Sequence, residues 1–192
     1  GEMCSGTPAI AETFALFYRK LYAERARADR ESMRSLLREF SLPGLTGARA
    51  RCLEHPITLE EVIDSIQNMN PGKTPGPDGF PMEYYRIFQD LLGPHMLAFF
   101  SEAISRGEFP SETNLATIVV LPKPGLPLQC CASYRPFSLI NSELKIFAKI
   151  LANRLTGAIS DLVHTDQCGF MPARSTRHCI RRLHTALAGV GE

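Results

Sequence analysis

Apolar residues recur along this 192-residue chain mainly with the 3.6-residue period of an α-helix. Near the N-terminus, Thr7 and Pro8 have the chemistry of a helix start, and the apolar positions after them fall in one stripe. The residues of this stripe are Ile10, Phe14, Phe17, Tyr18 and Leu21. The charged stretch over residues 25–39 predicts a second, more exposed helix. The alternative for everything before residue 55 is a flexible linker with amphipathic character.

The clearest helix start in the sequence lies at Thr58. Glu61 follows three residues later, so each of the two side chains can bond the backbone amide of the other in a capping box. Ile57 and Val62 occupy the positions of a hydrophobic staple. The helix is expected to end at residues 70–72, where the sequence reads Asn-Pro-Gly. Its predicted buried face consists of Val62, Ile63, Ile66 and Met69.

The middle of the chain changes from loop to helix to strand. Residues 71–81 are so rich in proline and glycine that a helix interior and a central strand are both excluded, and a shaped loop is expected. Two helices are predicted next, over residues 82–89 and 91–106. The β-branched run over residues 116–121 predicts a strand, and residues 135–139 predict a second one, which gives a hairpin-like pair.

The strongest helical pattern begins after Asn141, whose side chain is a candidate N-cap. Lys145, Lys149 and Arg154 project from other sides of this helix, toward either a polyanion or solvent. A last helix is expected from Thr176 onward. Together these elements predict an α+β fold that is mostly helical. The predicted buried face of the strongest helix consists of Leu144, Phe147, Ala148, Leu151, Leu155 and Ile159.

Composition is that of a soluble globular protein, with 44% hydrophobic and 21% charged residues. The net charge of +1 hides an asymmetry between the two halves of the chain. Residues 117–192 hold 9 Lys/Arg and 4 Asp/Glu, or +5, which leaves 12 and 16, or −4, for residues 1–116. A basic half fits a surface that faces a polyanion, although charged faces are more often simply solvated.

Several classes of protein are disfavoured by the sequence. No apolar run approaches the roughly 20 residues that span a bilayer, and residues 1–20 lack the features of a signal peptide. We therefore expect an intracellular protein, nuclear or cytoplasmic, that is not secreted and has no membrane partner. The six cysteines have no disulfide-scaffold spacing, so free thiols are expected. No metal site is expected, because no standard zinc spacing is matched by His164, Cys168, His178 and Cys179.

Four short motifs follow one another along the chain. Residues 73–80 read KTPGPDGF, and residues 121–125 read LPKPG. Residues 134–139 read YRPFSL, and residues 167–172 read QCGFMP. In this order and at these separations the motifs resemble the N-terminal half of the reverse transcriptase of LINE-type (non-LTR) retrotransposons. The resemblance extends from about residue 13 to residue 190.

The resemblance implies a partial right-hand polymerase fold. Residues 55–192 would form the fingers and the beginning of the palm, and residues 1–54 a helical linker or N-terminal extension. Lys123 and Arg135 resemble the fingers residues that contact the phosphates of the incoming dNTP. A planar guanidinium beside an ammonium group suits a triphosphate. The alternative is two solvent-facing cations on an edge hairpin.

The resemblance also implies an RNA template or an RNA/DNA duplex as partner. The candidate contacts come from the proline- and glycine-rich loop, the helix after the second strand and the last motif. The alternatives are a turn that joins two helices and a helix face that is solvated. The candidates are Lys73, Lys149, Gln167, Phe170 and Arg174.

Catalysis in this family needs carboxylates that hold Mg²⁺. The chain has no Asp-Asp pair and no Asp after Asp166, so we expect no catalytic residue and no cofactor in it, Mg²⁺ belonging to the intact enzyme. The expected function is that of an RNA-directed DNA polymerase fragment, truncated before the catalytic aspartates and inactive alone. The alternative is a domesticated or remnant structural or protein-interaction module. Apolar surface facing a missing palm would then favour binding of that palm or self-association.

Overall fold

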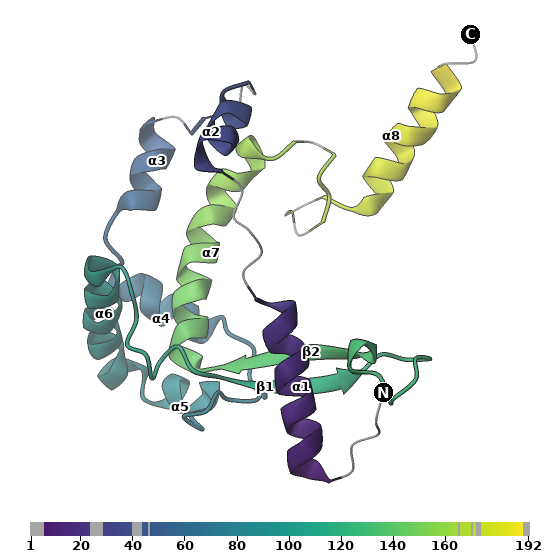
Figure 1. Cartoon of the computed structure of the whole chain (residues 1–192). Coiled ribbons are helices and arrows are strands. Elements are labelled where there is room, and N and C mark those ends of the chain that lie inside the picture. Colours follow the sequence, from purple (N-terminus) through teal and green to yellow (C-terminus); the bar gives the residue numbers. More distant parts are fainter. Residues whose placement is uncertain are drawn as a thin grey trace.

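A computed structural model of the chain describes residues 6–23, 29–39, 44–45, 47–164, 166–169, 171 and 174–189, without the side chains of residues 49, 52, 160, 161 and 189. Two antiparallel strands lie among helices, which confirms the expected α+β, mostly helical class (Figure 1). The elements are α1 (Thr7–Leu21), α2 (Arg30–Glu39), α3 (Gly47–Glu54), α4 (Leu59–Gln67), α5 (Met82–Ile87), α6 (Gln89–Arg106), β1 (Ala116–Pro122), the 3₁₀ turn η1 (Cys131–Ser133), β2 (Tyr134–Ile140), α7 (Ser142–Leu162) and α8 (Thr176–Gly189).

Helix α4 begins at the predicted capping box. The Oγ1 atom of Thr58 accepts a hydrogen bond from the backbone N–H of Glu61 (3.3 Å), and Oε2 of Glu61 accepts one from the N–H of Thr58 (2.9 Å). Ile57 and Val62, at the two staple positions, are buried. The sequence therefore predicted both the start of α4 and the way in which it enters the core.

The end of α4 differs slightly from the prediction. The helix ends at Gln67, a few residues before the expected stop at residues 70–72. The guanidinium of Arg86, from α5, donates hydrogen bonds to the carbonyl oxygens of Ile66 and Gln67 (3.3 and 2.8 Å) and to that of Met69. These bonds satisfy carbonyl groups that the end of a helix leaves without partners.

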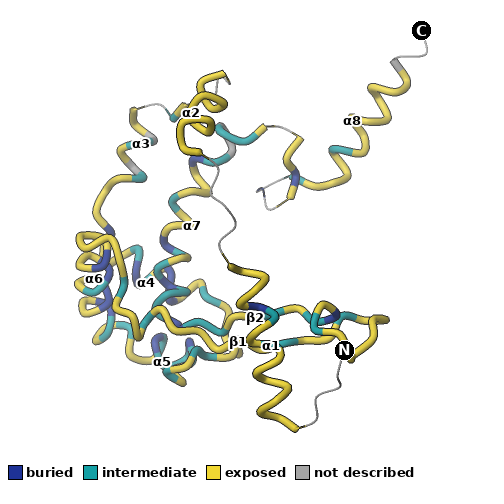
Figure 2. The backbone as a smooth tube through the Cα atoms, in the orientation of Figure 1, coloured by how far each residue is buried: buried dark blue, intermediate teal, exposed yellow. Residues whose placement is uncertain are grey.

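The hydrophobic core lies where α4, α5, α6 and α7 meet (Figure 2). Phe147 of α7 packs beside it, with its ring centroid 5.3 Å from that of Phe100 and 5.0 Å from that of Phe109. Because the core contains residues from segments that are far apart in the sequence, the middle of the chain packs as one unit. The buried members are Ile57, Val62, Ile66, Met82, Tyr85, Met96, Phe100, Ile146 and Ile150.

The buried face of α7 is not the one that the sequence predicted. Ile146 and Ile150 are buried, whereas Leu151 and Leu155 are 39% and 48% exposed. Apolar residues occur on more than one side of α7, so the period alone did not distinguish the side that packs against α4 and α6. The prediction was wrong for Ala148, Leu151 and Leu155, which are exposed. The other predicted residues, Leu144, Phe147 and Ile159, are half-buried.

Strands β1 and β2 form an antiparallel pair in which Leu121 lies opposite Arg135. Both strands were predicted, each within a few residues of its observed ends. Helix α1 packs against one face of the pair (Figure 1), where the ring of Phe14 meets that of Tyr134 edge to face at a centroid distance of 4.9 Å. A groove between α1 and this face, about 600 Å³ in volume, is lined by residues that include Phe14, Ile118 and Val120.

Helix α1 differs from the prediction in its start and in its burial. Its N-cap is Gly6, at φ 98°, so Thr7 and Pro8 are the first two helical residues. Tyr18 is buried, but Ile10 and Leu21, from the same predicted stripe, are 43% and 48% exposed. The stripe faces a two-stranded sheet, which is too narrow to cover its full length.

The remaining helices lie at the surface. Helix α2 has no buried residue, as expected for the charged stretch over residues 25–39. Helix α3 was not predicted. Helix α8 projects away from the other helices (Figure 1). Among the described residues, no helix combines the length and the apolar character that crossing a membrane would require.

Candidate nucleic-acid interface

The proline- and glycine-rich loop over residues 71–81 is held by the start of α7. Oδ1 of Asn141 accepts a hydrogen bond from the N–H of Asp78 (3.3 Å), and Oγ of Ser142 donates to the carbonyl of Phe80 (2.9 Å). Asn141 is the N-cap residue of α7, as predicted, but its side chain makes no cap bond and binds the loop instead. The loop therefore has a fixed position relative to α7, although it has no regular structure.

Gly76 lies directly against Asn141, the N-cap residue of α7. A Cβ atom at this position would lie 2.2 Å from Oδ1 of Asn141 and 2.4 Å from its backbone nitrogen. Gly79 has φ 76°, in the region that favours glycine. Oδ1 of Asp78 accepts from the N–H of Phe80 (3.1 Å), which closes the expected turn. The close contact at Gly76, the positive φ at Gly79 and the turn at Asp78 thus explain why the loop has these residue types.

Three lysine side chains come together beside this loop. Lys73, Lys145 and Lys149 line a cavity of about 260 Å³ at the junction of the loop with α7. Nζ of Lys145 donates to the carbonyl of Thr74 (3.0 Å), whereas Lys73 is exposed. Two of the three, Lys73 and Lys149, were predicted as nucleic-acid contacts from motifs about 75 residues apart in the sequence. We call this group the lysine cluster.

One carboxylate supports the base of the loop beside the lysine cluster. Oε1 of Glu83, in the first turn of α5, accepts a hydrogen bond from the N–H of Gly72 (2.6 Å). This backbone hydrogen bond holds the pKa of Glu83 below its usual value. Through this bond Glu83 fixes the backbone of Gly72, the residue that precedes Lys73.

Lys123 and Arg135 lie on one face of the β1–β2 pair. Because Leu121 is opposite Arg135 and side chains alternate along a strand, Lys123 points to the same face as Arg135. The backbone N–H of Lys123 continues the ladder by donating to Ser133 (2.8 Å), and its Nζ donates to the carbonyl of Ala132 (2.8 Å). This face is opposite to the one on which α1 packs.

Arg135 differs from Lys123 in its surroundings. It is exposed, and its guanidinium makes no hydrogen bond or ion pair with any residue that the structure describes. Apolar side chains lie next to it on the same face, with Leu121 46% and Phe137 49% exposed. The face therefore combines free positive charge with uncovered apolar surface.

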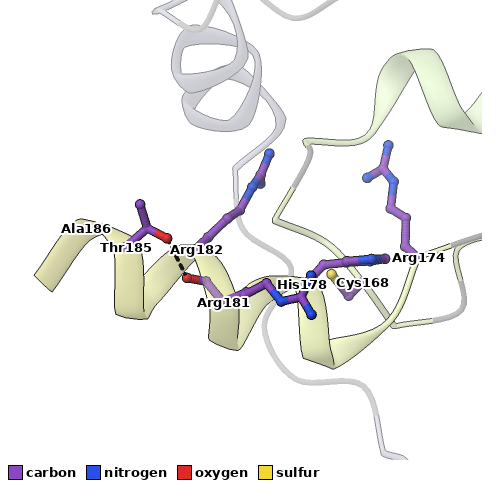
Figure 3. Close-up of a pocket in the computed structure, with 7 residues that line it drawn as sticks. All are labelled: Cys168, Arg174, His178, Arg181, Arg182, Thr185 and Ala186. Carbon is purple, nitrogen blue, oxygen red and sulfur yellow. Dashed lines mark hydrogen bonds between the residues drawn. The ribbon is translucent and has the colours of Figure 1, made fainter. Parts of the chain in front are cut away.

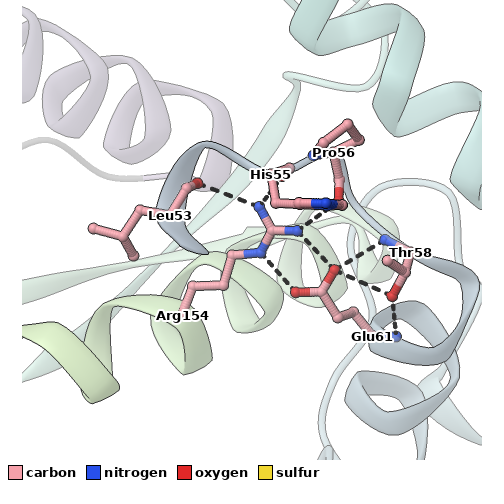
Figure 4. Close-up of polar contacts among 6 residues, drawn as sticks. All are labelled: Leu53, His55, Pro56, Thr58, Glu61 and Arg154. Carbon is pink, nitrogen blue, oxygen red and sulfur yellow. Dashed lines mark hydrogen bonds and ion pairs between the residues drawn. The ribbon is translucent and has the colours of Figure 1, made fainter. Parts of the chain in front are cut away.

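Arg154 is a structural residue, not one that faces a partner (Figure 4). Its guanidinium forms two bonds to Glu61, from Nε to Oε1 (2.6 Å) and from Nη2 to Oε2 (2.7 Å). It also donates to the carbonyl oxygens of Leu53, His55 and Pro56. The hydrogen bond from Arg154 holds the pKa of Glu61 below its usual value. The sequence left open whether Arg154 faces a template. Since its guanidinium binds Glu61 and backbone carbonyl groups of the same chain, Arg154 does not face a template.

The candidates near the C-terminus lie apart from the lysine cluster. Nε2 of Gln167 donates to the carbonyl of Gly169 (3.2 Å). The guanidinium of Arg174 donates to the carbonyl oxygens of Val163, His164 and Gln167, so it shapes the segment before α8. Phe170 lies outside the described residues. For Arg174, the structure provides a positioning role that the motif did not predict.

An open pocket of about 680 Å³ adjoins this segment (Figure 3). Among the α8 residues of its lining, the sequence had drawn attention only to His178, as part of the rejected zinc pattern, although the charge count had placed an excess of positive charge in this half of the chain. Asp166 offsets part of that charge through an ion pair with Arg182. The pocket is lined by Cys168, Arg174, His178, Arg181, Arg182, Thr185 and Ala186.

A metal site does not emerge from the residues that the structure describes. Within them, no three His, Cys, Asp or Glu side chains gather as a group that could hold an ion. The chemistry available is that of lysine and arginine side chains, which bind phosphate groups by charge and hydrogen bonding.

Comparison with known proteins identified several relatives, although no protein-family model matches the chain. It is 36% identical over 134 residues, 70% of the chain, to the transposon TX1 uncharacterized 149 kDa protein of Xenopus laevis. It is 31% identical over 131 residues, 67% of the chain, to the probable RNA-directed DNA polymerase from transposon BS of Drosophila melanogaster. It is 29% identical over 147 residues, 70% of the chain, to the retrovirus-related Pol polyprotein from type-1 retrotransposable element R1 of Bradysia coprophila. These matches cover 10%, 14% and 14% of the relatives.

Proposed function

This chain belongs to the family of RNA-directed DNA polymerases of non-LTR retrotransposons, and on that premise we propose that it is the nucleic-acid-holding front part of such a polymerase. Residues 55–192 form the fingers and the beginning of the palm, and residues 1–54 form a helical extension. The partners are an RNA template or RNA/DNA duplex and a dNTP.

The lysine cluster carries this proposal. Lys73, Lys145 and Lys149 come from a rigid loop and from α7, and the hydrogen bonds of Asn141 and Ser142 hold the loop in place. Three lysines that line one small cavity suit the backbone phosphates of a nucleic acid, which carry one negative charge each. Because the loop is held in this way, the backbone of Lys73 is already fixed beside α7 before the ligand arrives, which lowers the entropic cost of binding.

The second contact in the proposal is the Lys123–Arg135 face of the hairpin, which takes the triphosphate of the dNTP. Arg135 supplies an unpaired guanidinium, and Lys123 is already positioned by its bond to Ala132. Gln167, Phe170 and Arg174 complete the proposal as further template contacts. In it, Arg174 acts by shaping the segment that holds Gln167.

The chain on its own does not polymerise in this proposal. Two-metal phosphoryl transfer needs carboxylates that hold Mg²⁺, and the chain has no Asp-Asp pair. Purified protein is therefore expected to leave a primer on an RNA template unextended in the presence of Mg²⁺ and dNTPs. Extension above the level of a mock purification would contradict this part of the proposal.

The experiment that tests nucleic-acid binding is titration of the chain with a DNA-primed RNA template across a salt series. Lys73→Ala and Lys149→Ala should each weaken binding and reduce the slope of log K against log salt by about 0.7–0.9. Arg106→Ala is the matched control, because it also removes one positive charge but lies in an exposed pair with Glu102. Slopes equal to that of Arg106→Ala in both lysine variants would overturn the assignment.

A second candidate function is a protein-interaction module, and the exposed apolar residues beside Arg135 favour it. Val119, Leu121 and Phe137 are 38%, 46% and 49% exposed on the same face of the hairpin. If the chain is monodisperse and folded but does not bind the duplex, self-association through this face is the next possibility to test. Phe137→Ser should then lower the apparent mass in sedimentation.

A further inference from the structure

Two cysteine side chains that are eleven residues apart meet beside the open pocket described above, which Arg174, Arg181 and Arg182 help to line. The Sγ atoms of Cys168 and Cys179 lie 2.6 Å apart. A covalent S–S bond is about 2.05 Å long, so the thiols are close to bonding distance without being bonded. Cys168 belongs to the turn over residues 166–169, and Cys179 lies in the first turn of α8. The contact therefore joins the pocket-forming segment to the helix.

Other bonds hold the same two segments together, so the approach of the thiols does not rest on one contact. Arg182 of α8 forms an ion pair with Asp166, and Sγ of Cys179 donates to the carbonyl of Asp166 (3.1 Å). Arg174 binds the carbonyl oxygens on the other side of the turn. The two sulfur atoms are thus brought together by a framework of backbone and charged contacts.

Both thiols are placed where a small oxidant can reach them. Cys168 is itself buried but lines the open pocket, and Cys179 is half-buried. The hydrogen bond with Cys168 and the neighbouring charge of Asp166 raise the pKa of Cys179, while the nearby Arg182 opposes this shift. Cys179 is therefore mainly in its thiol form near neutral pH, and its thiolate fraction is the form that reacts with an oxidant.

We propose that Cys168 and Cys179 form a redox site, in which a peroxide converts the two thiols into a reversible disulfide that fastens the start of α8 to the 166–169 turn. This site is separate from the lysine cluster, and it does not depend on the proposed polymerase function. Its substrate class is hydrogen peroxide or an alkyl hydroperoxide, and a dithiol restores the reduced form.

The chemistry balances as two thiols and one hydrogen peroxide giving one disulfide and two waters. Cys179, the more exposed thiol, loses its proton, and its sulfur attacks one peroxide oxygen. The O–O bond breaks, Cys179 becomes a sulfenic acid and the first water leaves. The sulfur of Cys168 then attacks the sulfenic sulfur, the S–S bond forms and the S–O bond breaks. The second water carries away the proton of Cys168.

The test is peptide mapping of the full chain after exposure to hydrogen peroxide. Trypsin cleaves at Arg154, Arg174, Arg177 and Arg181, which places Cys168 in the peptide 155–174 and Cys179 in the peptide 178–181. Without reductant, these two peptides are expected as one disulfide-linked species. Dithiothreitol should separate them into the two free peptides.

Variants at the other described cysteines make the result specific. The double variant Cys130→Ser/Cys131→Ser should still give the linked species, whereas Cys179→Ser should lose it and leave Cys168 as a free or singly oxidised thiol. Circular dichroism of wild-type protein before and after oxidation checks that the chain stays folded. The proposal is overturned if folded wild-type protein yields the two peptides as separate species, whether their cysteines are unmodified or over-oxidised. It is also overturned if either peptide is linked to a different cysteine.

Discussion

Arg154 of α7 and Glu61 of α4 form a bidentate ion pair in which the arginine side chain is 12% exposed and the glutamate 32%. The same carboxylate closes the capping box by accepting from the N–H of Thr58. One glutamate therefore fixes the start of α4 and joins α4 to α7, while the remaining donors of Arg154 bind the carbonyl groups before α4 (Figure 4).

The first prediction concerns Arg154→Ala. The substitution leaves the Glu61 carboxylate without its partner and several carbonyl groups without donors, so the free energy of unfolding should fall by about 2–4 kcal/mol. Arg106→Ala removes the partner of Glu102 in a pair whose side chains are 68% and 60% exposed, and it should cost at most about 1 kcal/mol. Urea denaturation of both variants measures the difference. Equal losses would show that Arg154 is not a structural residue.

The second prediction is the pH dependence of the same pair. The pKa of Glu61 in the folded protein lies below its ordinary value of 4.5, because Arg154 binds the carboxylate, so the ionised form of Glu61 stabilises the fold above that pH. This stabilisation should disappear as the pH falls through the lowered folded pKa. The difference in unfolding free energy between wild type and Glu61→Gln should therefore be full at pH 7 and shrink below about pH 4. A difference that stays constant down to pH 2 would contradict the assignment.

The third prediction compares two glycines. Gly76→Ala would place a Cβ atom 2.2 Å from Oδ1 of Asn141, so it should lower the unfolding free energy by about 1–3 kcal/mol. Gly157→Ala, inside α7 with no atom other than those of the adjoining helix backbone within 4 Å of the new Cβ, should raise it by about 0.5–1 kcal/mol. Thermal unfolding followed by circular dichroism distinguishes the two signs. A stabilising Gly76→Ala would mean that the loop does not contact α7 this closely.

The fourth prediction uses two tyrosines with opposite surroundings. The hydroxyl of Tyr18 is buried without a hydrogen-bond partner among the described residues, so Tyr18→Phe should raise the unfolding free energy by about 1 kcal/mol. The hydroxyl of Tyr85 donates to Glu143 (2.9 Å), so Tyr85→Phe should lower it by about 1–2 kcal/mol. Denaturant titration of the two variants provides the measurement, and changes of the same sign would refute the pairing.

Local signals predicted much of the fold. The capping box at Thr58, the β-branched run before Pro122 and the proline-rich loop each have a chemistry that depends on a few neighbouring residues. The buried face of α7 was not predictable in this way. Both Leu151 and Ile150 satisfy a helical period, and the choice between them was made by α4 and α6, which are distant in the sequence.

The sequence pointed to residues of the candidate site, but it did not predict that these residues lie close together in space. The motifs identified Lys73 and Lys149, and the structure brings them together with Lys145 at one cavity. The role of Arg154 was missed, because a basic residue on an amphipathic helix has the same pattern whether it binds Glu61 or a partner. The meeting of Cys168 with Cys179 was likewise invisible to spacing rules, since it depends on how the turn folds back on α8.

The bonds between the 71–81 loop and the start of α7 also limit how this protein can be recombined with its relatives. Asp78 and Asn141 are 63 positions apart, and Phe80 and Ser142 are 62 apart. A chimera made with a single crossover between residues 82 and 140 takes the loop from one parent and its anchors from the other. An exchange that preserves the lysine cluster must transfer the 71–81 loop and the start of α7 together. The unit that can be exchanged is therefore made of two segments that are not adjacent in the sequence.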